Sequence, residues 1–127
     1  ITAGEQLRIT PQIATFFARH PGCRLHNHYG PTESHVVVAH TLAGEPAAWP
    51  VLPPIGRPVG NVRIYLLDAH GAPVAEGVAG EIHIGGAQLA RGYRNLDALG
   101  EARFLADPFS GTPGARMYRT GDLGRWR

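Results

Sequence analysis

NHYGPTE, residues 27–33, is the stretch of this sequence from which both the fold and a site can be inferred. Residues 24–28 can form an extended strand, whereas the Gly-Pro pair at positions 30 and 31 cannot continue a ladder of hydrogen bonds. Polar residues that begin with Thr32 and Glu33 follow before an apolar run begins at Val36. The pattern predicts a strand that ends in a loop, and such loops commonly carry ligand sites.

The side chains of this loop suit a nucleoside triphosphate. Tyr29 offers a flat ring for a base, and Asn27 offers an amide for the edge of a base. Thr32 offers a hydroxyl for a phosphate oxygen, and Glu33 a carboxylate that a hard cation such as Mg²⁺ accepts as a ligand. A structural turn with a stacked tyrosine explains the heptapeptide equally well, because short motifs recur by chance.

Composition limits the classes of protein. The 127 residues, of which 43% are hydrophobic, allow at most one domain, and a first residue that is Ile1 rather than Met indicates a piece of a longer protein. The net charge of +2 is spread along the chain, which disfavours nucleic-acid binding. Cys23 is a lone cysteine, and no apolar run or signal sequence indicates a membrane, so we expect a reducing, cytoplasmic location.

The first part of the chain predicts the end of an α/β subdomain. A short strand at residues 1–4 precedes a helix that begins after Thr10, a good N-cap, and ends at the Pro-Gly pair 21–22. Strands at 24–28 and 34–42 follow, which makes a strand-helix-strand unit. Residues 45–58 contain five prolines and predict an extended connector, so we place a domain boundary near residue 50, between 1–50 and 51–127.

The second part predicts mostly β structure. Strands are expected at 62–66 and 81–84, joined through a hairpin turn at 68–71, with the glycines at 85 and 86 ending the second strand. A short helix is expected at 97–104. A strand at 117–120 then leads through a turn at Gly121 and Asp122 into residues 123–126. These elements predict a small barrel or curled sheet.

Four phrases occur in one order: ITAGE at the start, NHYGPTE, GEIHIGGAQLARGY at 80–93, and YRTGDLGRW at 118–126. In these motifs the chain resembles the adenylate-forming enzymes, and most closely the amino-acid adenylation domains of non-ribosomal peptide synthetases. The resemblance implies the end of an α/β subdomain followed by a distorted β-barrel. It also implies a two-step reaction, in which ATP activates an amino acid as its adenylate and the acyl group passes to the phosphopantetheine of a peptidyl carrier protein, next to condensation domains.

The resemblance assigns roles to individual residues. It places Tyr29 against adenine, Asn27 near its amino edge, Thr32 on the α-phosphate and Glu33 on Mg²⁺, so that Thr32 and Glu33 are the expected catalytic residues. Asp122 corresponds to the acid that holds both ribose hydroxyls. The remaining nucleotide-binding positions lie beside these, at Gly4, Glu5, Gln6, His28 and Gly30. The 80–93 run is expected to be structural, with Arg91 bracing its loop.

The family pattern also gives an acyl pocket, whose expected lining residues are Ile1, Ala3, His28, Val36 and Val37. Four of the five are apolar, and the set contains no carboxylate, lysine or arginine that could pair with a charged substrate side chain. The set resembles that of proline-activating domains, so we expect proline. Val36 and Val37 are neighbours, which would face opposite sides of a regular strand. Either the strand start is irregular or one of the two belongs to the core.

Other interpretations remain open. His26, His28, Glu33 and His35 could form a metal cluster. An acyl- or aryl-acid ligase using coenzyme A shares the same loop, and a non-catalytic adenylation-like scaffold module would keep the fold. The chain has no lysine and lacks the family's glycine-rich phosphate loop, substrate-ammonium acid, hinge and mobile small domain. We therefore expect the isolated chain to form no adenylate.

Overall fold

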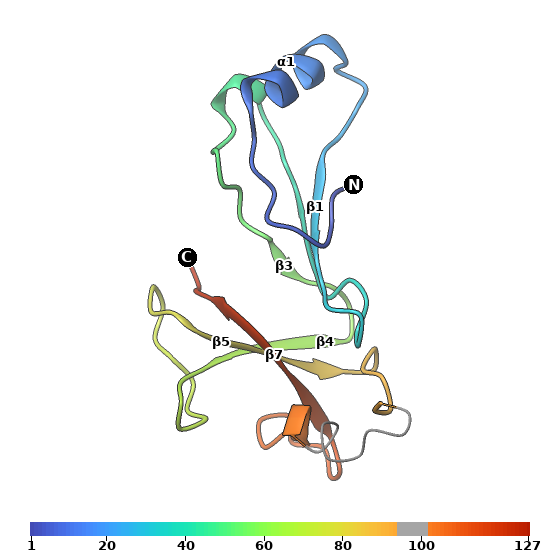
Figure 1. The fold of residues 1–127 in the computed structure, drawn as a ribbon, viewed down its shortest axis with the longest axis vertical. Coiled ribbons are helices and arrows are strands. Elements are labelled where there is room, and N and C mark those ends of the chain that lie inside the picture. Colours follow the sequence, from blue (N-terminus) through green and yellow to red (C-terminus); the bar gives the residue numbers. More distant parts are fainter. Residues whose placement is uncertain (94–101) are drawn as a thin grey trace. The chain divides into compact units, whose positions relative to one another are not determined.

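The computed structural model describes residues 1–93 and 102–127 (Figure 1). The chain forms two compact units: unit 1 comprises residues 1–31 and 36–59, and unit 2 comprises residues 32–35 and 60–127. Unit 1 contains a three-stranded sheet and unit 2 a four-stranded sheet. Residues 27–31 of NHYGPTE therefore belong to unit 1, and its last two residues, Thr32 and Glu33, belong to unit 2.

The described residues are mostly β, with one α-helix. In chain order the elements are α1 (Pro11–Arg19), β1 (His26–Tyr29), β2 (Val38–Thr41), the 3-10 helix η1 (Pro46–Ala48), β3 (Arg57–Pro58), β4 (Val62–Leu67), β5 (Gly80–Gly86), β6 (Phe104–Ala106) and β7 (Arg116–Gly124). No helix in the described ranges is long and apolar enough to cross a membrane.

Helix α1 begins where the sequence predicts. The Thr10 side chain accepts a hydrogen bond from the Ile13 amide at 3.3 Å, and Pro11 occupies the first helical position. Phe17 packs against the core of unit 1, with its ring 5.4 Å from that of Trp49. Phe16, which helical spacing places on the same buried stripe, is instead 50% exposed and stacks on His20. The buried stripe is therefore narrower than predicted.

The sheet of unit 1 has the order β1-β2-β3 and is antiparallel throughout. Thr2 lies along the other side of β1 and forms a parallel bridge with Asn27, through hydrogen bonds of 2.9 Å with the backbones of His26 and His28. Because α1 connects Thr2 to β1, the predicted strand-helix-strand unit is present with one parallel bridge in place of a full strand pair. The α/β character expected here is correspondingly reduced.

Strand β2 begins at Val38, four residues later than predicted. His35 has a φ of 54°, in the left-handed region, so an extended strand cannot run from residue 34. The Val37 amide donates to the Tyr29 carbonyl at 2.9 Å and closes the loop before β2 starts. The prediction of a strand at 34–42 is thus wrong for its first residues, and Val36 and Val37 lie in the loop.

Residues 45–58 form an extended segment that packs within unit 1. The Val51 carbonyl accepts from the Ile9 amide at 2.8 Å, and the Pro54 carbonyl accepts from Asn27 Nδ2 at 3.1 Å. Its last residues form β3, which pairs with β2. The extended backbone predicted from the prolines is therefore present except at the 3-10 helix η1, and the packing shows that the segment is part of unit 1.

Unit 2 is an open antiparallel sheet in the order β4-β5-β7-β6. Its buried apolar side chains are Leu66, Leu67, Ile82, Ile84, Phe104, Met117 and Tyr118. The predicted turn at 68–71 is confirmed, because Gly71 donates to the Asp68 carbonyl and Asp68 Oδ1 accepts from the amides of His70 and Ala72. Within the described residues the sheet does not close into the expected barrel.

Three predictions for unit 2 need correction. Gly85 and Gly86 lie inside β5, where a Cβ at position 85 would be 2.7 Å from Asp107 Oδ2. Gly121 and Asp122 lie inside β7, whose ladder continues past them to Gly124. Of the helix expected at 97–104, residues 97–101 fall outside the described ranges, Ala102 and Arg103 are helical as predicted, and Phe104 instead begins β6.

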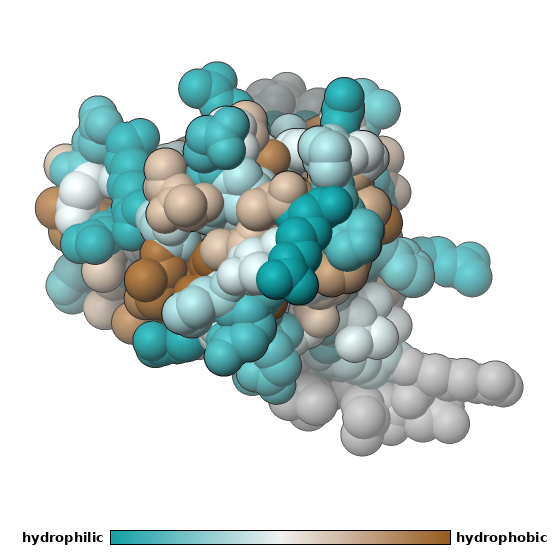
Figure 2. All heavy atoms as spheres, turned by 90° about the horizontal axis from the view of Figure 1, so that it is seen from above, coloured by the Kyte–Doolittle hydropathy of each residue, from teal (hydrophilic) through white to brown (hydrophobic). Residues whose placement is uncertain are grey.

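Large apolar side chains are exposed in both units, and apolar patches are visible at the surface among hydrophilic residues in Figure 2. Ile1 is 81% exposed in unit 1, and Leu123 is 75% exposed in unit 2. The described residues therefore do not bury all of their apolar surface among themselves.

Candidate functional site

Glu33 is the acid of NHYGPTE, and in unit 2 it is held by a chain of phenols. The Tyr93 hydroxyl donates a hydrogen bond to Glu33 Oε1, and the Tyr118 hydroxyl lies 3.1 Å from that of Tyr93. The Glu33 carbonyl accepts from the Ala90 amide at 2.8 Å. Both the backbone and the side chain of Glu33 are thus fixed by residues that lie far along the chain.

These contacts keep the Glu33 carboxylate ionised. Burial raises the pKa of Glu33, but hydrogen bonds from Tyr93 and Tyr118 and the charge of Arg103 together bring that pKa below its usual value. Burial also raises the pKa of Tyr118 far above its usual value, so this phenol stays protonated and remains a donor. The site therefore presents an anionic oxygen pair with neutral donors behind it.

The chemistry of this donor set fits a hard divalent cation. Mg²⁺ is usually bound through one or two carboxylates together with substrate phosphates and water. Glu33 is partly exposed, and Tyr93 donates to only one of its two oxygens. Glu33 would hold the cation, and the cation would neutralise phosphate charge when bound.

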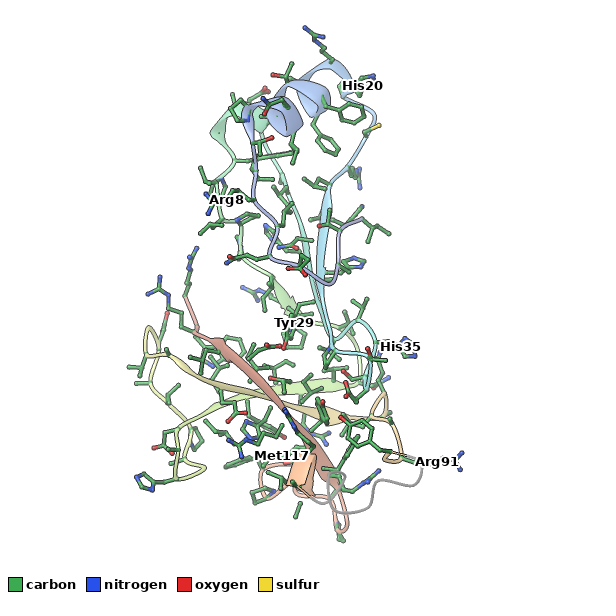
Figure 3. All side chains as sticks on the ribbon, viewed as in Figure 1. Arg8, His20, Tyr29, His35, Arg91 and Met117 are labelled. Carbon is green, nitrogen blue, oxygen red and sulfur yellow. The ribbon has the colours of Figure 1, made fainter. Side chains whose placement is uncertain are left out.

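The Phe104 ring packs against both phenols, edge-on to Tyr93 and tilted to Tyr118. The Phe104 ring on β6 lies 5.6 Å from the Tyr93 ring and 5.0 Å from the Tyr118 ring. The Arg116 guanidinium lies 5.4 Å from the centre of the Phe104 ring and donates to the carbonyls of Ala90 and Arg91. Arg91 itself points away from the sheet (Figure 3), so its carbonyl, rather than its side chain, takes part in fixing this loop.

The first half of the motif lies on β1 in unit 1. Asn27 is 3% exposed, and its Nδ2 already donates to the Pro54 carbonyl at 3.1 Å. Tyr29 ends the strand (Figure 3), is partly exposed, and is followed directly by Gly30. The contacts with adenine expected of Asn27 and Tyr29 stay predictions, and Asn27 would make its own with the amide atoms not used by Pro54.

The chain before α1 brings further predicted residues to β1. The bridge between Thr2 and Asn27 places Ile1 and Ala3 alongside the strand that carries His28. Gly4 follows with a φ of 95°, a backbone conformation that favours glycine. Glu5 and Gln6 are exposed after this bend. Unit 1 therefore gathers the predicted acyl-pocket residues and the predicted nucleotide-lining segment around a single strand.

Val36 and Val37 differ in their surroundings. Val37 is completely buried in unit 1, and its carbonyl accepts from the Val59 amide, whereas Val36 is partly exposed. The irregular strand start and the burial of Val37 thus both occur. The lining role of these two valines stays a prediction.

Thr32 and Asp122 are both exposed residues of unit 2. Asp122 lies on β7, and its amide donates to Thr120 Oγ1 at 3.0 Å. Their expected contacts with the α-phosphate and the ribose stay predictions. Both side chains lie where a ligand from solvent can reach them.

The histidine-rich cluster does not assemble. Over residues 1–93 and 102–127, no group of three or more His, Cys, Asp and Glu side chains is placed to hold a metal ion. His26 Nδ1 lies 2.9 Å from Thr41 Oγ1, and the His26 and His28 rings are 6.1 Å apart. This geometry gives the alternative of a metal cluster no support among the described residues.

Sequence reasoning missed the residues that hold the predicted acids. Tyr93 and Tyr118 support Glu33, and Glu81 accepts from the Gly121 amide beside Asp122. Glu81 and Tyr93 belong to the 80–93 motif, which was expected to be structural. Tyr118 belongs to the 118–126 motif, in which the expected functional residue is Asp122. No signal in the sequence alone pairs these residues with the predicted acids, because Tyr93 lies 60 residues after Glu33 and Glu81 lies 40 residues before Gly121.

The chain belongs to the AMP-binding enzyme family, whose model matches residues 1–94. These enzymes are adenylate-forming, and the similarity to known proteins narrows the group. The chain corresponds to part of the adenylation domains of non-ribosomal peptide synthetases, enzymes of antibiotic peptide synthesis.

Relatives and solved structures agree on this assignment. Gramicidin S synthase 2 of Brevibacillus brevis is 48% identical over 126 residues, which are 99% of this chain and 3% of that protein. PA1221, an adenylation and PCP domain protein, is 38% identical with a TM-score of 0.85, over 98% of this chain and 25% of that chain. The four-domain synthetase AB3403, solved with AMP and glycine, is 32% identical with a TM-score of 0.76, over 98% of this chain and 9% of that chain. The chain thus spans a small part of the proteins it matches.

Proposed function

We propose that this chain supplies the loop for ATP and Mg²⁺ in an adenylation domain that activates an amino acid. The observation that supports this most is the Glu33 carboxylate, which is ionised, partly exposed and held by a hydrogen bond from Tyr93. The chain that carries it belongs to the AMP-binding enzyme family. In the larger fold, unit 1 would be the end of an α/β subdomain and unit 2 part of a distorted β-barrel. We place the protein in the cytoplasm.

The proposed reaction has two transfers. A carboxylate oxygen of the amino acid attacks the α-phosphorus of ATP, the bond to the β-phosphate oxygen breaks, and pyrophosphate leaves. The thiol of a carrier protein's phosphopantetheine then attacks the acyl carbon, and AMP leaves with the bonding electron pair. Thr32 would orient the α-phosphate, Glu33 would hold the cation, and Asp122 would bind the ribose. Peptidyl carrier and condensation domains are the proposed partners.

Proline is the proposed amino acid. The candidate pocket residues Ile1, Ala3, Val36 and Val37 offer no charge to a substrate side chain, so a charged amino acid would be bound with its charge unpaired. A pocket of this kind separates substrates that differ by one methylene by only about 1–3 kcal/mol. Measurable exchange with small apolar amino acids is therefore expected beside a preference for proline.

Amino-acid-dependent exchange of pyrophosphate into ATP tests this proposal. The complete adenylation domain that contains these residues should exchange best with proline, and Glu33→Gln should lower the rate by about a hundredfold or more. If no amino acid supported exchange, the proposal would be overturned. Product formation with coenzyme A and an organic acid would instead favour the ligase alternative. Nucleotide binding without exchange would favour the scaffold.

A further inference from the structure

Strand β7 contains a bulge at residues 120–122, which includes Asp122. His83 on β5 pairs with Arg119, but Glu81 pairs with Leu123, so three residues of β7 lie opposite one residue of β5. Gly121, in the middle of the bulge, has a φ of 86°, which few other residues adopt. Bulges redirect side chains and often stand next to functional sites. This bulge sets the direction in which the Asp122 side chain points from β7.

Glu81 on β5 closes one side of the bulge. Its Oε1 accepts from Arg119 Nε at 2.9 Å and from the Gly121 amide at 3.0 Å, and its Oε2 lies 3.0 Å from the same Arg119 nitrogen. The Gly121 amide would otherwise have no place in the β5-β7 ladder, because the register shifts there. Glu81 thus takes up a backbone donor that the bulge creates.

Two further side chains fix the other parts of the bulge. Thr120 Oγ1 donates to the Ile82 carbonyl at 2.8 Å and accepts from the Asp122 amide at 3.0 Å. Arg103 Nη1 donates to the carbonyls of Arg119 and Thr120, at 3.2 and 3.0 Å. The backbone of residues 119–122 is therefore held by side chains from β5, from β7 itself and from the segment before β6.

Stability alone explains this arrangement poorly. The Arg119 side chain is 53% exposed, and an ion pair with so exposed a partner contributes about 0–1 kcal/mol. A second arginine–carboxylate pair in the same unit, Arg63 with Asp107, includes a carboxylate side chain that is 0% exposed. What distinguishes the Glu81–Arg119 pair is its contact with the backbone next to Asp122.

We propose that Glu81 and Arg119 are positioning residues, which hold the β7 bulge so that the Asp122 carboxylate meets the ribose hydroxyls of the nucleotide. The inference depends on the proposed function, because Asp122 is assigned to the ribose there. It adds residues that touch no substrate and act through the geometry of the bulge. Loss of either residue should weaken recognition of the ribose and leave the contacts of Glu33 intact.

The test compares the affinities of the complete adenylation domain for AMP and for 2′-deoxy-AMP, measured by calorimetry. The ratio of the affinity for AMP to the affinity for 2′-deoxy-AMP reports recognition of the ribose 2′-hydroxyl. Differences in the folded fraction of a preparation cancel in this ratio. Glu81→Ala and Arg119→Gln should each lower the ratio by about threefold to tenfold, the worth of one poorly placed hydrogen bond to a charged group. Glu81→Gln retains an acceptor for the Gly121 amide and should give an intermediate ratio.

Two variants calibrate the measurement. Arg63→Gln removes the Arg63–Asp107 pair and should keep the wild-type ratio, even if it lowers stability. Asp122→Asn should lower the ratio at least as far as Glu81→Ala. If Asp122→Asn lowers the ratio and neither Glu81→Ala nor Arg119→Gln does, the positioning role is wrong and the proposed function survives. If Asp122→Asn itself keeps the wild-type ratio, the ribose assignment fails and takes this inference with it.

Discussion

The Tyr93 phenol donates a hydrogen bond to the carboxylate of Glu33, which lies 60 residues earlier in the chain. The two residues end two different sequence motifs, NHYGPTE and GEIHIGGAQLARGY. A motif that sequence analysis classifies as structural is therefore in direct contact with the predicted metal ligand. The arrangement makes the orientation of Glu33 depend on the loop that follows β5.

Tyr93→Phe removes this phenol and should weaken cation binding by the complete domain. Without the donor, the Glu33 carboxylate loses a fixed orientation, and its pKa returns toward the usual value. The Mg²⁺ concentration that supports half-maximal pyrophosphate exchange should rise by about threefold to tenfold. Tyr65→Phe is the matched control, because Tyr65 also donates to a carboxylate in unit 2, that of Asp107. An equal shift in both variants would contradict a specific role for Tyr93.

Gly56→Ala should destabilise unit 1 by at least about 2 kcal/mol, because two separate costs add. A Cβ at this position would lie 2.0 Å from the Ala39 carbonyl oxygen, and the backbone has a φ of 106°. Thermal unfolding and soluble yield of the complete domain measure the effect. Gly60→Ala is the control, since nothing lies within 4 Å of its added Cβ. A Gly56→Ala protein as stable as the wild type would contradict the close approach of Gly56 to the Ala39 carbonyl.

Local signals predict the elements whose geometry is set by nearby residues. Thr10 and Pro11 specify the start of α1, and Asp68 with Gly71 specifies the turn after β4. In each case the hydrogen bonds that define the feature close within a few residues. Short-range side-chain chemistry is sufficient for such features.

Features set by distant partners escape such reasoning. Gly121 and Asp122 look like a turn in sequence, but contacts that include Glu81 on the neighbouring strand hold them in a bulge within a continuous β7. Gly85 resembles a strand end, yet it is a strand residue whose missing side chain makes room for Asp107. The candidate site shows the same limit, since its acids follow from their motifs but the contact of Tyr93 with Glu33 does not.

Asp107→Ala should lower the stability of unit 2 by about 1–3 kcal/mol, because it removes the acceptor for several donors. Asp107 Oδ2 accepts from Arg63 Nη2 at 3.2 Å and from the Tyr65 hydroxyl at 3.1 Å, and Oδ1 accepts from the Phe109 amide at 3.0 Å. Denaturant unfolding of the complete domain provides the measurement. Asp107→Asn retains the Oδ1 acceptor and should cost less. A larger loss from Asp107→Asn than from Asp107→Ala would contradict this explanation.

The acid dependence of stability should include a contribution from Glu81. The hydrogen bond from Arg119 holds the pKa of the Glu81 carboxyl below its usual value. Because this folded-state pKa is lowered, the stabilisation is present above the unfolded value and is lost as the pH falls through the folded one. In Glu81→Gln the contribution is absent at every pH.

The difference in unfolding temperature between the wild-type domain and Glu81→Gln should therefore be largest near about pH 7 and should shrink toward about pH 3. Arg119→Gln should show the same convergence, since it removes the other half of the pair. Glu76→Gln, which removes the carboxylate of an exposed glutamate of unit 2, is the matched control. If the difference for Glu81→Gln grew as the pH fell, the carboxylate would be stabilised in its protonated form, and the ion pair that braces the bulge would not exist in solution.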